Sequence, residues 1–321
     1  MATHPLIDLH RHLEGSIRSS TFLDVARRDG HPLAAEARPR DLLVAGGPLG
    51  GLLPYLAKVD DQIGVFRTLD DWRRAGREAV EDAFDDGLDY VEVRFSPYFI
   101  HQQTGLAPTA VIDAVADGVA AGSRGTGLPV GLIATILRDL GPERAAEQVT
   151  TFLTRRGVWC GVDLAGNEAG YAAALFAPAF ARVRDAGLHI TVHAGEAAGP
   201  ESVRAAVEHL GAERIGHGVR AAEDPRLLDD LARTGVTLEV ALTSNTQTGA
   251  APGYRDHQIH TLLAAGVGVT LNTDNPRVSD VTLSQEHALA RYATGLSDEQ
   301  LRRVAEQSAT AAFGDLSLSL G

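Results

Sequence analysis

Residues 5–16 read PLIDLHRHLEGS, an apolar run that ends in two closely spaced histidines, His10 and His12. In a β-strand, side chains at positions i and i+2 point to the same face. Two imidazoles on one face at the end of a strand can therefore share one metal ion. A His-x-His pair alone is more often incidental than metal-binding, so its meaning depends on what stands at the other strand ends.

Seven more short β-like runs follow along the chain, and longer helical patterns separate them. Several runs are almost continuously apolar, which is typical of parallel strands buried on both faces. The eight expected strands cover residues 5–10, 89–95, 129–136, 158–164, 188–193, 213–217, 236–241 and 267–274.

Helical periodicity fills the intervals between these strands. The clearest expected helices cover residues 70–87, 109–122, 142–156 and 223–234. The last of them opens with Glu-Asp-Pro, a signal for a helix start. Four glycines stand after a helix and before a strand, where a left-handed residue usually ends a helix. They are Gly87, Gly187, Gly235 and Gly266.

The alternation of strands and helices predicts βαβ units and a parallel sheet. Eight strands favour closure into a (β/α)8 TIM barrel over an open doubly wound sheet, and residues 1–321 suit one such domain. Neither Gly-x-Gly-x-x-Gly nor Gly-x-x-x-x-Gly-Lys stands at a strand–helix turn, which argues against nucleotide-binding α/β folds.

Residues 17–69 are too many for the first helix of a barrel. We expect helix 1 and then an N-terminal insertion over the C-terminal face of the barrel, with the Gly-rich piece GGPLGG at residues 46–51. Such an insertion can serve as a lid over a site. A surface decoration without a role in function is an equally good interpretation.

The composition is that of an ordinary globular protein, with 44% hydrophobic and 22% charged residues. A formal net charge of −13 disfavours nucleic acid as a partner and suits a small neutral or cationic ligand. We find neither a membrane-spanning apolar run nor a secretory signal, so we expect a cytoplasmic protein. The lone Cys160 excludes an internal disulfide and a Cys-x-x-Cys metal site.

Polar groups stand at the ends of three later strands, where the chemistry of this fold lies. The fifth strand ends with His193 and Glu196, the sixth with His217 and the eighth with Asp274. A closed barrel brings these ends to the rim that carries the first two histidines. Three imidazoles and a carboxylate suit a zinc ion with an open position for water, which such an ion activates at neutral pH.

Each of these residues also has a structural interpretation. His193 in an apolar strand would more often be a hydrogen-bonded core histidine, and His217 could bond a backbone carbonyl. Asp274 could open a turn, and Glu196 could cap the next helix. Together these interpretations require four unrelated coincidences, all at strand ends, so a catalytic metal site is the better hypothesis.

Seven short motifs stand in a fixed order along nearly the whole chain. They are HRHLEG (10–15), YVEVRFSP (90–97), DLAG (163–166), HAGE (193–196), IGHG (215–218), TSN (243–245) and NTD (272–274). In this order they resemble the adenosine deaminases of the amidohydrolase superfamily. The resemblance implies one zinc ion per chain and hydrolytic removal of the 6-amino group of an adenine nucleoside.

The resemblance also implies catalytic roles for the matching residues. The zinc ligands would be His10, His12, His193 and Asp274. Glu196 would protonate N1 of the purine, and His217 would orient the attacking water and handle its proton. The chemistry agrees, because attack at C6 breaks aromaticity and needs a proton at the adjacent nitrogen. A carboxylic acid supplies it if burial raises its pKa.

Three further residues would contact the substrate by the same resemblance. The backbone N–H of Gly166 would meet N3, Asn275 would face N7, and Glu14 would lie near the ribose 5′-hydroxyl. Many family members have Asp in place of Asn275 and of Glu14. An Asn amide can still donate to N7, whereas the longer Glu changes the 5′ contact. Bacterial relatives commonly show Cys-Pro where this chain has Ala241-Leu242.

We therefore expect a deaminase of adenosine and 2′-deoxyadenosine, with a small purine nucleoside as partner and no nucleic acid or membrane. A deaminase of a 5′-modified adenosine, such as aminodeoxyfutalosine of menaquinone biosynthesis, is the nearest alternative, followed by an adenine deaminase. A two-metal hydrolase would need a bridging lysine at the end of the fourth strand, which has none. An inactive purine-binding barrel would lack Glu196 or His217. The cytidine deaminase fold needs Pro-Cys-x-x-Cys, which a single cysteine excludes.

Overall fold

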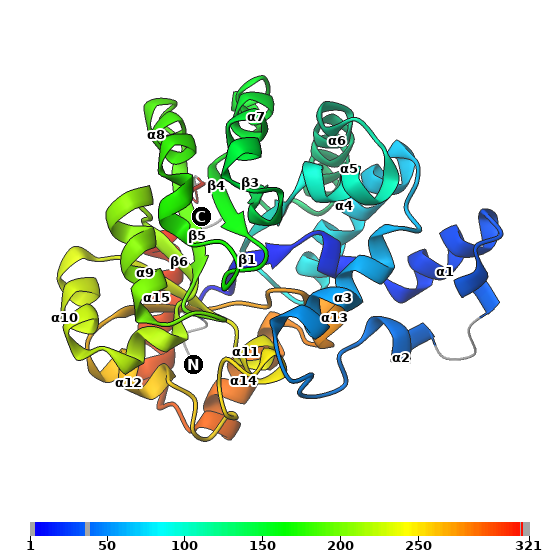
Figure 1. Cartoon of the computed structure of the whole chain (residues 1–321). Helices are drawn as coiled ribbons and strands as arrows, with labels where there is room; N and C mark the ends of the chain where they lie inside the picture. The colour runs from blue at the N-terminus through cyan, green and yellow to red at the C-terminus, as the bar shows by residue number, and fades with distance from the viewer. Residues whose placement is uncertain (1–3, 36–38, 315, 317–321) are drawn as a thin grey trace.

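A computed structural model describes residues 4–35, 39–314 and 316 of the chain, and Figure 1 shows its barrel. Eight parallel strands pair in chain order. They are β1 (Ile7–His12), β2 (Tyr90–Phe95), β3 (Val130–Leu137), β4 (Gly161–Ala165), β5 (His189–Ala194), β6 (Arg214–His217), β7 (Thr237–Val240) and β8 (Gly268–Leu271). Beyond β8, Asp274 completes the ring: its N–H donates to His10 O (2.8 Å) and its carbonyl accepts from His12 N (2.7 Å). The predicted (β/α)8 barrel is confirmed.

Every expected strand is present, with ends displaced by three residues at most. The expected fourth strand begins too early because residues 156–158 form a 3-10 turn, η4 (Arg156–Val158). The eighth ends early because Asp274 takes a left-handed conformation (φ 60°) and leaves the strand for β1. Apolar periodicity therefore located the strands, and local turns decided their ends.

Helices connect the strands on the outside of the barrel. The first crossover holds η1 (Glu14–Ser16), α1 (Ser19–Arg28), η2 (Pro32–Ala35), α2 (Pro39–Leu43), α3 (Leu52–Ile63) and α4 (Leu69–Asp85). The next three hold α5 (Pro97–Thr104), α6 (Pro108–Thr126), η3 (Arg138–Leu140), α7 (Pro142–Leu153), η5 (Ala173–Phe176) and α8 (Ala177–Asp185). The remaining helices are α9 (Pro200–Ala205), η6 (Ala206–Leu210), η7 (Val219–Glu223), α10 (Pro225–Thr234), α11 (Leu242–Thr248), α12 (Ile259–Ala264), α13 (Pro276–Ser279), α14 (Leu283–Leu289), η8 (Ala290–Thr294) and α15 (Asp298–Ala311). None of the helices in the described ranges is long and apolar enough to cross a bilayer.

Short-range signals account for where these helices begin and end. Thr68 and Asp71 form a capping box at the start of α4, in which each side chain accepts the backbone N–H of the other (both 3.2 Å). The four glycines expected to end helices all have left-handed backbones, which glycine adopts without steric strain. Their φ values are 80° for Gly87, 65° for Gly187, 77° for Gly235 and 78° for Gly266.

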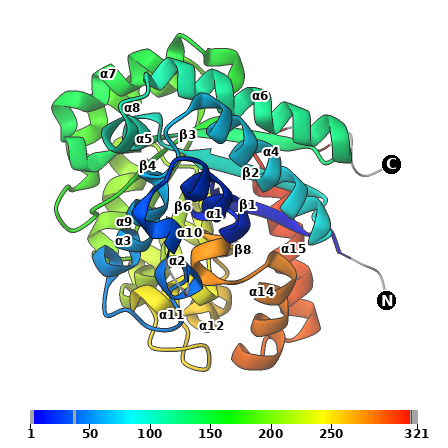
Figure 2. The ribbon, with the colours of Figure 1, turned by 90° about the vertical axis from the view of Figure 1, so that its right-hand side faces the viewer.

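In the described part of the segment 17–69 there are three α-helices, where a simple barrel would have one. Figures 1 and 2 show α1, α2 and α3, drawn in blue, together at one side of the barrel. Helix α3 contacts η1 at the end of β1, and also α5 and α11, which follow β2 and β7. The insertion therefore lies over the C-terminal ends of the strands, as the sequence predicts. Its movement as a lid stays a prediction.

The contact between α4 and α6 provides a test of this packing. Gly118 of α6 lies so close to α4 that a Cβ there would be 2.0 Å from the carbonyl oxygen of Arg73. We expect Gly118→Ala to lower the free energy of unfolding by about 1–3 kcal/mol, because the backbone must shift. Chemical denaturation measures this change.

The matched control is Gly125→Ala in the same helix, where a Cβ would meet nothing within 4 Å. It should be neutral or stabilising by up to about 1 kcal/mol, because alanine is the better helix former. Equal stability of the two variants would show that the two helices do not pack this closely.

Candidate active site

A cavity of about 330 Å³ opens at the C-terminal ends of the strands, where α3 contributes Leu52, Leu56 and Val59 to its wall. His10 is fully buried and lies beneath this lining. The other eight residues that the sequence singles out all line the cavity. They are His12, Glu14, Gly166, His193, Glu196, His217, Asp274 and Asn275.

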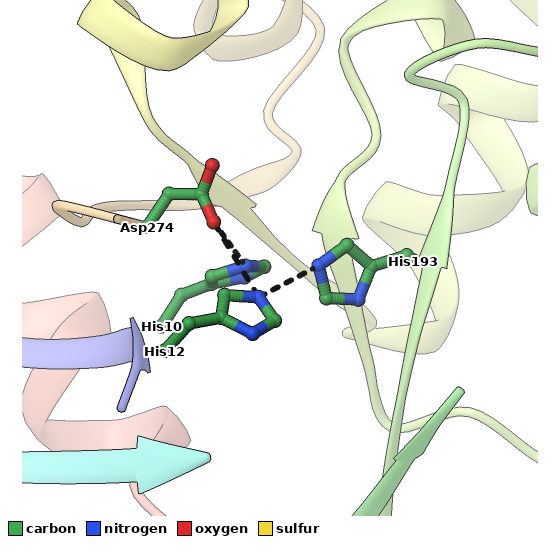
Figure 3. A group of neighbouring side chains, drawn as sticks. All are labelled: His10, His12, His193 and Asp274. Carbon is green, nitrogen blue, oxygen red and sulfur yellow. Dashed lines mark hydrogen bonds and ion pairs between the residues drawn. The ribbon is translucent and has the colours of Figure 1, made fainter. Parts of the chain in front are cut away.

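Four side chains converge at one point beside this cavity (Figure 3). His10 and His12 come from β1, His193 comes from β5, and Asp274 follows β8. The Nε2 atoms of His12 and His193 are 3.2 Å apart. Oδ1 of Asp274 is 3.4 Å from Nε2 of both His10 and His12. One ligand atom from each residue lies within 4.8 Å of all the others, so the group could hold a metal ion.

The electrostatic state of this cluster suits a divalent cation. Burial lowers the pKa of His12 well below its ordinary value, which keeps the ring neutral and its lone pair available. Burial opposes charge on Asp274, but its contact with His10 (3.4 Å) and the other nearby imidazoles hold its pKa well below the usual range. Nε2 of His10 is buried without a hydrogen-bond partner among the described residues. A cation would satisfy this atom and the carboxylate together.

A second ring of polar groups orients the cluster. Nδ1 of His10 lies 2.7 Å from Oε2 of Glu239 in β7. Nδ1 of His193 lies 3.1 Å from Oδ1 of Asp163 in β4. A carboxylate that accepts the Nδ1–H of an imidazole directs its Nε2 lone pair toward a metal. Ser244 donates to Oδ2 of Asp274 (2.6 Å), which leaves Oδ1 facing the cluster.

Sequence reasoning assigned no role to Glu239, and quoted Asp163 and Ser244 only as parts of motifs. The available signal was a carboxylate inside an apolar run, as in VTLEV at residues 236–240. An ionised group buried on a strand needs a partner, because burial without one is strongly unfavourable. The pattern predicts a partner, but does not say that it is a histidine.

Glu196 and His217 form a second pair next to the cluster. Oε2 of Glu196 lies 3.6 Å from Nε2 of His217. Burial raises the pKa of Glu196 well above its ordinary value, so the site favours the acid form of this side chain. Burial lowers the pKa of His217 well below its ordinary value. The amide of Asn245 lies 2.9 Å from Nδ1 of His217 and holds the ring in place.

The backbone is strained at two of these residues. His217 has φ 63° and Asp274 has φ 60°, values that residues other than glycine rarely adopt. Such conformations typically cost about 1–3 kcal/mol each and persist where the surroundings enforce them, often at functional sites. Here each marks the point where the chain leaves its strand and presents a side chain to the cavity.

Glu14 lines the cavity and is buried. Its Oε1 accepts the backbone N–H of Ser96 (2.7 Å), and its buried Oε2 has no hydrogen-bond partner among the described residues. Burial raises the pKa of Glu14 to about 7. One carboxyl oxygen therefore accepts a backbone hydrogen bond, and the other is available to a ligand.

Asn275 and Gly166 also take positions that suit ligand contact. Nδ2 of Asn275 donates to Oδ1 of Asp274 (2.7 Å), and an amide group carries a second N–H. Gly166 has φ 111°, and a Cβ there would lie 1.9 Å from Oδ2 of Asp139. Only glycine fits this position, so the backbone lies directly at the cavity wall.

The family comparison agrees with this geometry. The sequence profile described as adenosine deaminase matches residues 5–319. The chain belongs to the adenosine deaminase family. An adenosine deaminase of Edwardsiella ictaluri (strain 93-146) is 44% identical over 313 residues, which cover 96% of this chain and 93% of that protein. The resemblance inferred from the seven motifs is confirmed.

Solved structures show the same barrel. An adenine deaminase from Arthrobacter aurescens superposes with a TM-score of 0.91 and is 26% identical, covering 98% of this chain and 95% of its own. An amidohydrolase from Burkholderia ambifaria with bound Zn has a TM-score of 0.90 at 25% identity, covering 97% of this chain and 86% of its own. These two proteins share the fold of this chain, which belongs to a family of hydrolytic deaminases of purines.

One further residue holds the loop that carries Glu196. The buried carboxylate of Glu168, after β4, accepts the backbone N–H groups of four successive residues, 195–198, at distances of 2.6, 3.1, 2.6 and 3.0 Å. The turn after β5 is therefore built around this carboxylate. Sequence reasoning missed Glu168, because an acidic residue in a polar loop is usually exposed to solvent.

Replacing Glu168 by Gln tests this arrangement. The side-chain NH2 group of Gln is a donor and would face backbone N–H groups, which are also donors. The turn must therefore rearrange, and Glu196 must move with it. We expect kcat for deamination to fall by roughly 10–100-fold, because a displacement of about 1 Å has this effect on a catalytic group. Steady-state kinetics and metal analysis measure the change, and the metal content should stay the same.

Glu201→Gln is the matched control, since Glu201 accepts only the N–H of Gly199 from the same loop (3.1 Å). Its kcat should stay within about twofold of the original protein, as for most exposed substitutions. A folded Glu168→Gln variant with unchanged kcat would show that this carboxylate does not position Glu196.

Proposed function

We propose that this protein is a zinc-dependent adenosine deaminase, which hydrolyses adenosine and 2′-deoxyadenosine to inosine or 2′-deoxyinosine and ammonia. One observation carries the proposal. A four-ligand cluster, a carboxyl group whose burial favours the protonated form and an imidazole whose burial favours the neutral form meet beside a single cavity. Hydrolytic deamination of an aromatic amine requires each of these three elements.

His10, His12, His193 and Asp274 would hold the zinc ion. Three imidazoles and a carboxylate are a donor set that zinc accepts, with a position left open for catalysis. When bound, zinc supplies a Lewis acid that makes water a strong nucleophile at neutral pH. The zinc in a structural neighbour supports this choice of metal.

Glu196 and His217 would move the protons. Protonated Glu196 donates its proton to N1 of the purine, which makes C6 electrophilic. Neutral His217 takes a proton from the attacking water as the bond between oxygen and C6 forms. It then delivers this proton to the 6-amino group, so the C6–N6 bond breaks and ammonia leaves. The hydroxyl proton at C6 returns to Glu196, which restores the acid.

Recognition of the base would use the two residues at the cavity wall. The backbone N–H of Gly166 would donate to N3, and the free N–H of Asn275 would donate to N7. Both ring nitrogens are acceptors, so neither contact requires a change of protonation. Together with Glu196 at N1 they would fix the orientation of the purine.

The charges around the cavity favour a neutral 5′ group. Its lining includes the carboxyl groups of Glu14, Asp60 and Asp139, whereas the described lining residues include no Lys or Arg. An anionic 5′ substituent, such as the carboxylate of aminodeoxyfutalosine, would meet repulsion without a compensating cation. The volume of about 330 Å³ and the apolar wall of α3 also favour a nucleoside over free adenine.

A substrate panel tests this assignment. We expect adenosine and 2′-deoxyadenosine to exceed adenine and aminodeoxyfutalosine in kcat/KM by at least about tenfold, or about 1.4 kcal/mol in transition-state binding. Loss of adenine absorbance on metal-analysed protein gives these rates. If the kcat/KM of adenine or of aminodeoxyfutalosine is tenfold higher than that of adenosine, the proposed substrate is wrong. The proposed deamination chemistry is not affected by that result.

Replacing Glu196 by Gln tests the mechanism separately. The variant keeps the size of the side chain and loses its proton, so kcat should fall by roughly 10²–10⁴-fold. Its zinc content should be unchanged. Removal of metal with a chelator should abolish turnover. Added zinc should restore the turnover of the original protein but not that of the variant. A zinc-loaded variant with normal turnover would refute the role of Glu196.

A further inference from the structure

The barrel interior contains a column of charged side chains beneath the metal cluster. Its centre is Glu239, whose Oε2 contacts Nδ1 of His10 (2.7 Å) and accepts from Nη2 of Arg94 (2.9 Å). Its Oε1 accepts from Nε of Arg214 (2.6 Å). All these side chains have at most 1% of their surface exposed. A residue that orients a metal ligand is thus itself held by two buried cations.

The column continues to the opposite end of the barrel. Nη2 of Arg214 donates to Oε2 of Glu92 (2.5 Å), and the backbone N–H of Phe313 donates to Oε1 of Glu92 (2.6 Å). The ring of Phe313 covers Arg214, with 3.5 Å between Cζ and the ring centroid. The same ring stacks on His189, at a centroid distance of 4.6 Å and an angle of 9°. Phe313 therefore holds the last cation of the column between a π-face and a carboxylate.

The start of β4 is shaped to receive this ring. A Cβ at Gly161, the first residue of β4, would lie 2.8 Å from Cδ2 of Phe313. His189, against which the ring stacks, is the first residue of β5. Phe313 follows α15 and so closes the end of the barrel opposite the cavity.

Ion pairs connect the column with the cluster. Arg94 pairs with Asp163 and Glu239, and Arg214 pairs with Glu92 and Glu239. His10 lies between Glu239 (2.7 Å) and Asp274 (3.4 Å). Buried charges without compensation are strongly destabilising, so a change at one end of this set of partners disturbs the pairing along it.

We propose that Phe313 is a positioning residue for the metal cluster at the other end of the barrel. Its ring and backbone N–H fix Arg214 and Glu92, Arg214 fixes Glu239, and Glu239 orients His10. The inference rests on the proposed zinc site and adds a residue that touches neither metal nor substrate.

The test compares zinc affinity in Phe313→Leu and Phe313→Tyr, measured by competition with a chromophoric chelator on the full-length protein. Leu fills space without a π-face, whereas Tyr keeps the aromatic ring. We expect Phe313→Leu to weaken zinc binding by roughly 3–10-fold, less than the 10–100-fold typical of direct partners of a ligand. Phe313→Tyr should bind zinc as tightly as the original protein does. The visible spectrum of the cobalt-substituted protein should shift in Phe313→Leu, whereas that of Phe313→Tyr should match the spectrum of the original protein.

Phe84→Leu, at a half-exposed position of α4, is the matched control and should leave zinc affinity unchanged. Gly161→Ala is an independent variant, because the added Cβ displaces the ring of Phe313 without removing it. It should weaken zinc binding in the same direction, and it tests the proposal even if Phe313→Leu does not fold.

A merely structural role makes a different prediction. It would lower the melting temperatures of the zinc-free and zinc-loaded proteins equally and leave zinc affinity within twofold, and this result would overturn the proposal. A double-mutant cycle with Glu239→Gln locates the path, since Phe313→Leu should add nothing to the loss of affinity in that background. Failure of the original protein to bind zinc at all would instead refute the proposed function.

Discussion

Asp274 closes the barrel and supplies a ligand atom to the metal cluster at the same time. Its backbone N–H and carbonyl bond to His10 and His12, and this pairing joins the end of β8 to β1. Its side chain then lies 3.4 Å from the imidazoles of both histidines. The left-handed backbone of Asp274 is the strain that makes this possible. Closure of the fold and assembly of the site are therefore one structural event.

Burial acts on every ionisable group of this site, and the sign of its effect depends on the charged form. It raises the pKa of Glu196, which keeps a proton available, and it lowers the pKa of His12 and His217, which keeps their lone pairs available. Burial beside one cavity thus favours the protonated form of an acid and the neutral forms of a base and of a metal ligand. Specific partners reverse the trend for Asp274, whose pKa they hold well below its usual range, and for His10, whose pKa they raise.

The barrel interior differs from a packing of branched apolar side chains alone. Buried arginines and carboxylates connect the metal cluster with the end of the barrel that Phe313 closes. Such a network is stable only when every member has a partner. It therefore demands precise positions of several strands at once, and it gives the two ends of the barrel a common electrostatic constraint.

The sequence by itself determined the eight strands, the helix ends at residues such as Gly87, and the motif positions that identify the family. These features depend on local periodicity, on backbone conformation and on the order of short motifs, all of which can be read along the chain. It also singled out nine site residues, which the structure brings together beside one cavity.

Only the tertiary structure decided which distant groups support them. Glu239 and His10 are 229 positions apart, and no local pattern relates them. The fourfold backbone contacts of Glu168 and the seat of Phe313 likewise exist only once the barrel has closed. The pKa values of the site also belong to this level, because burial is a property of the folded chain and not of its order of residues.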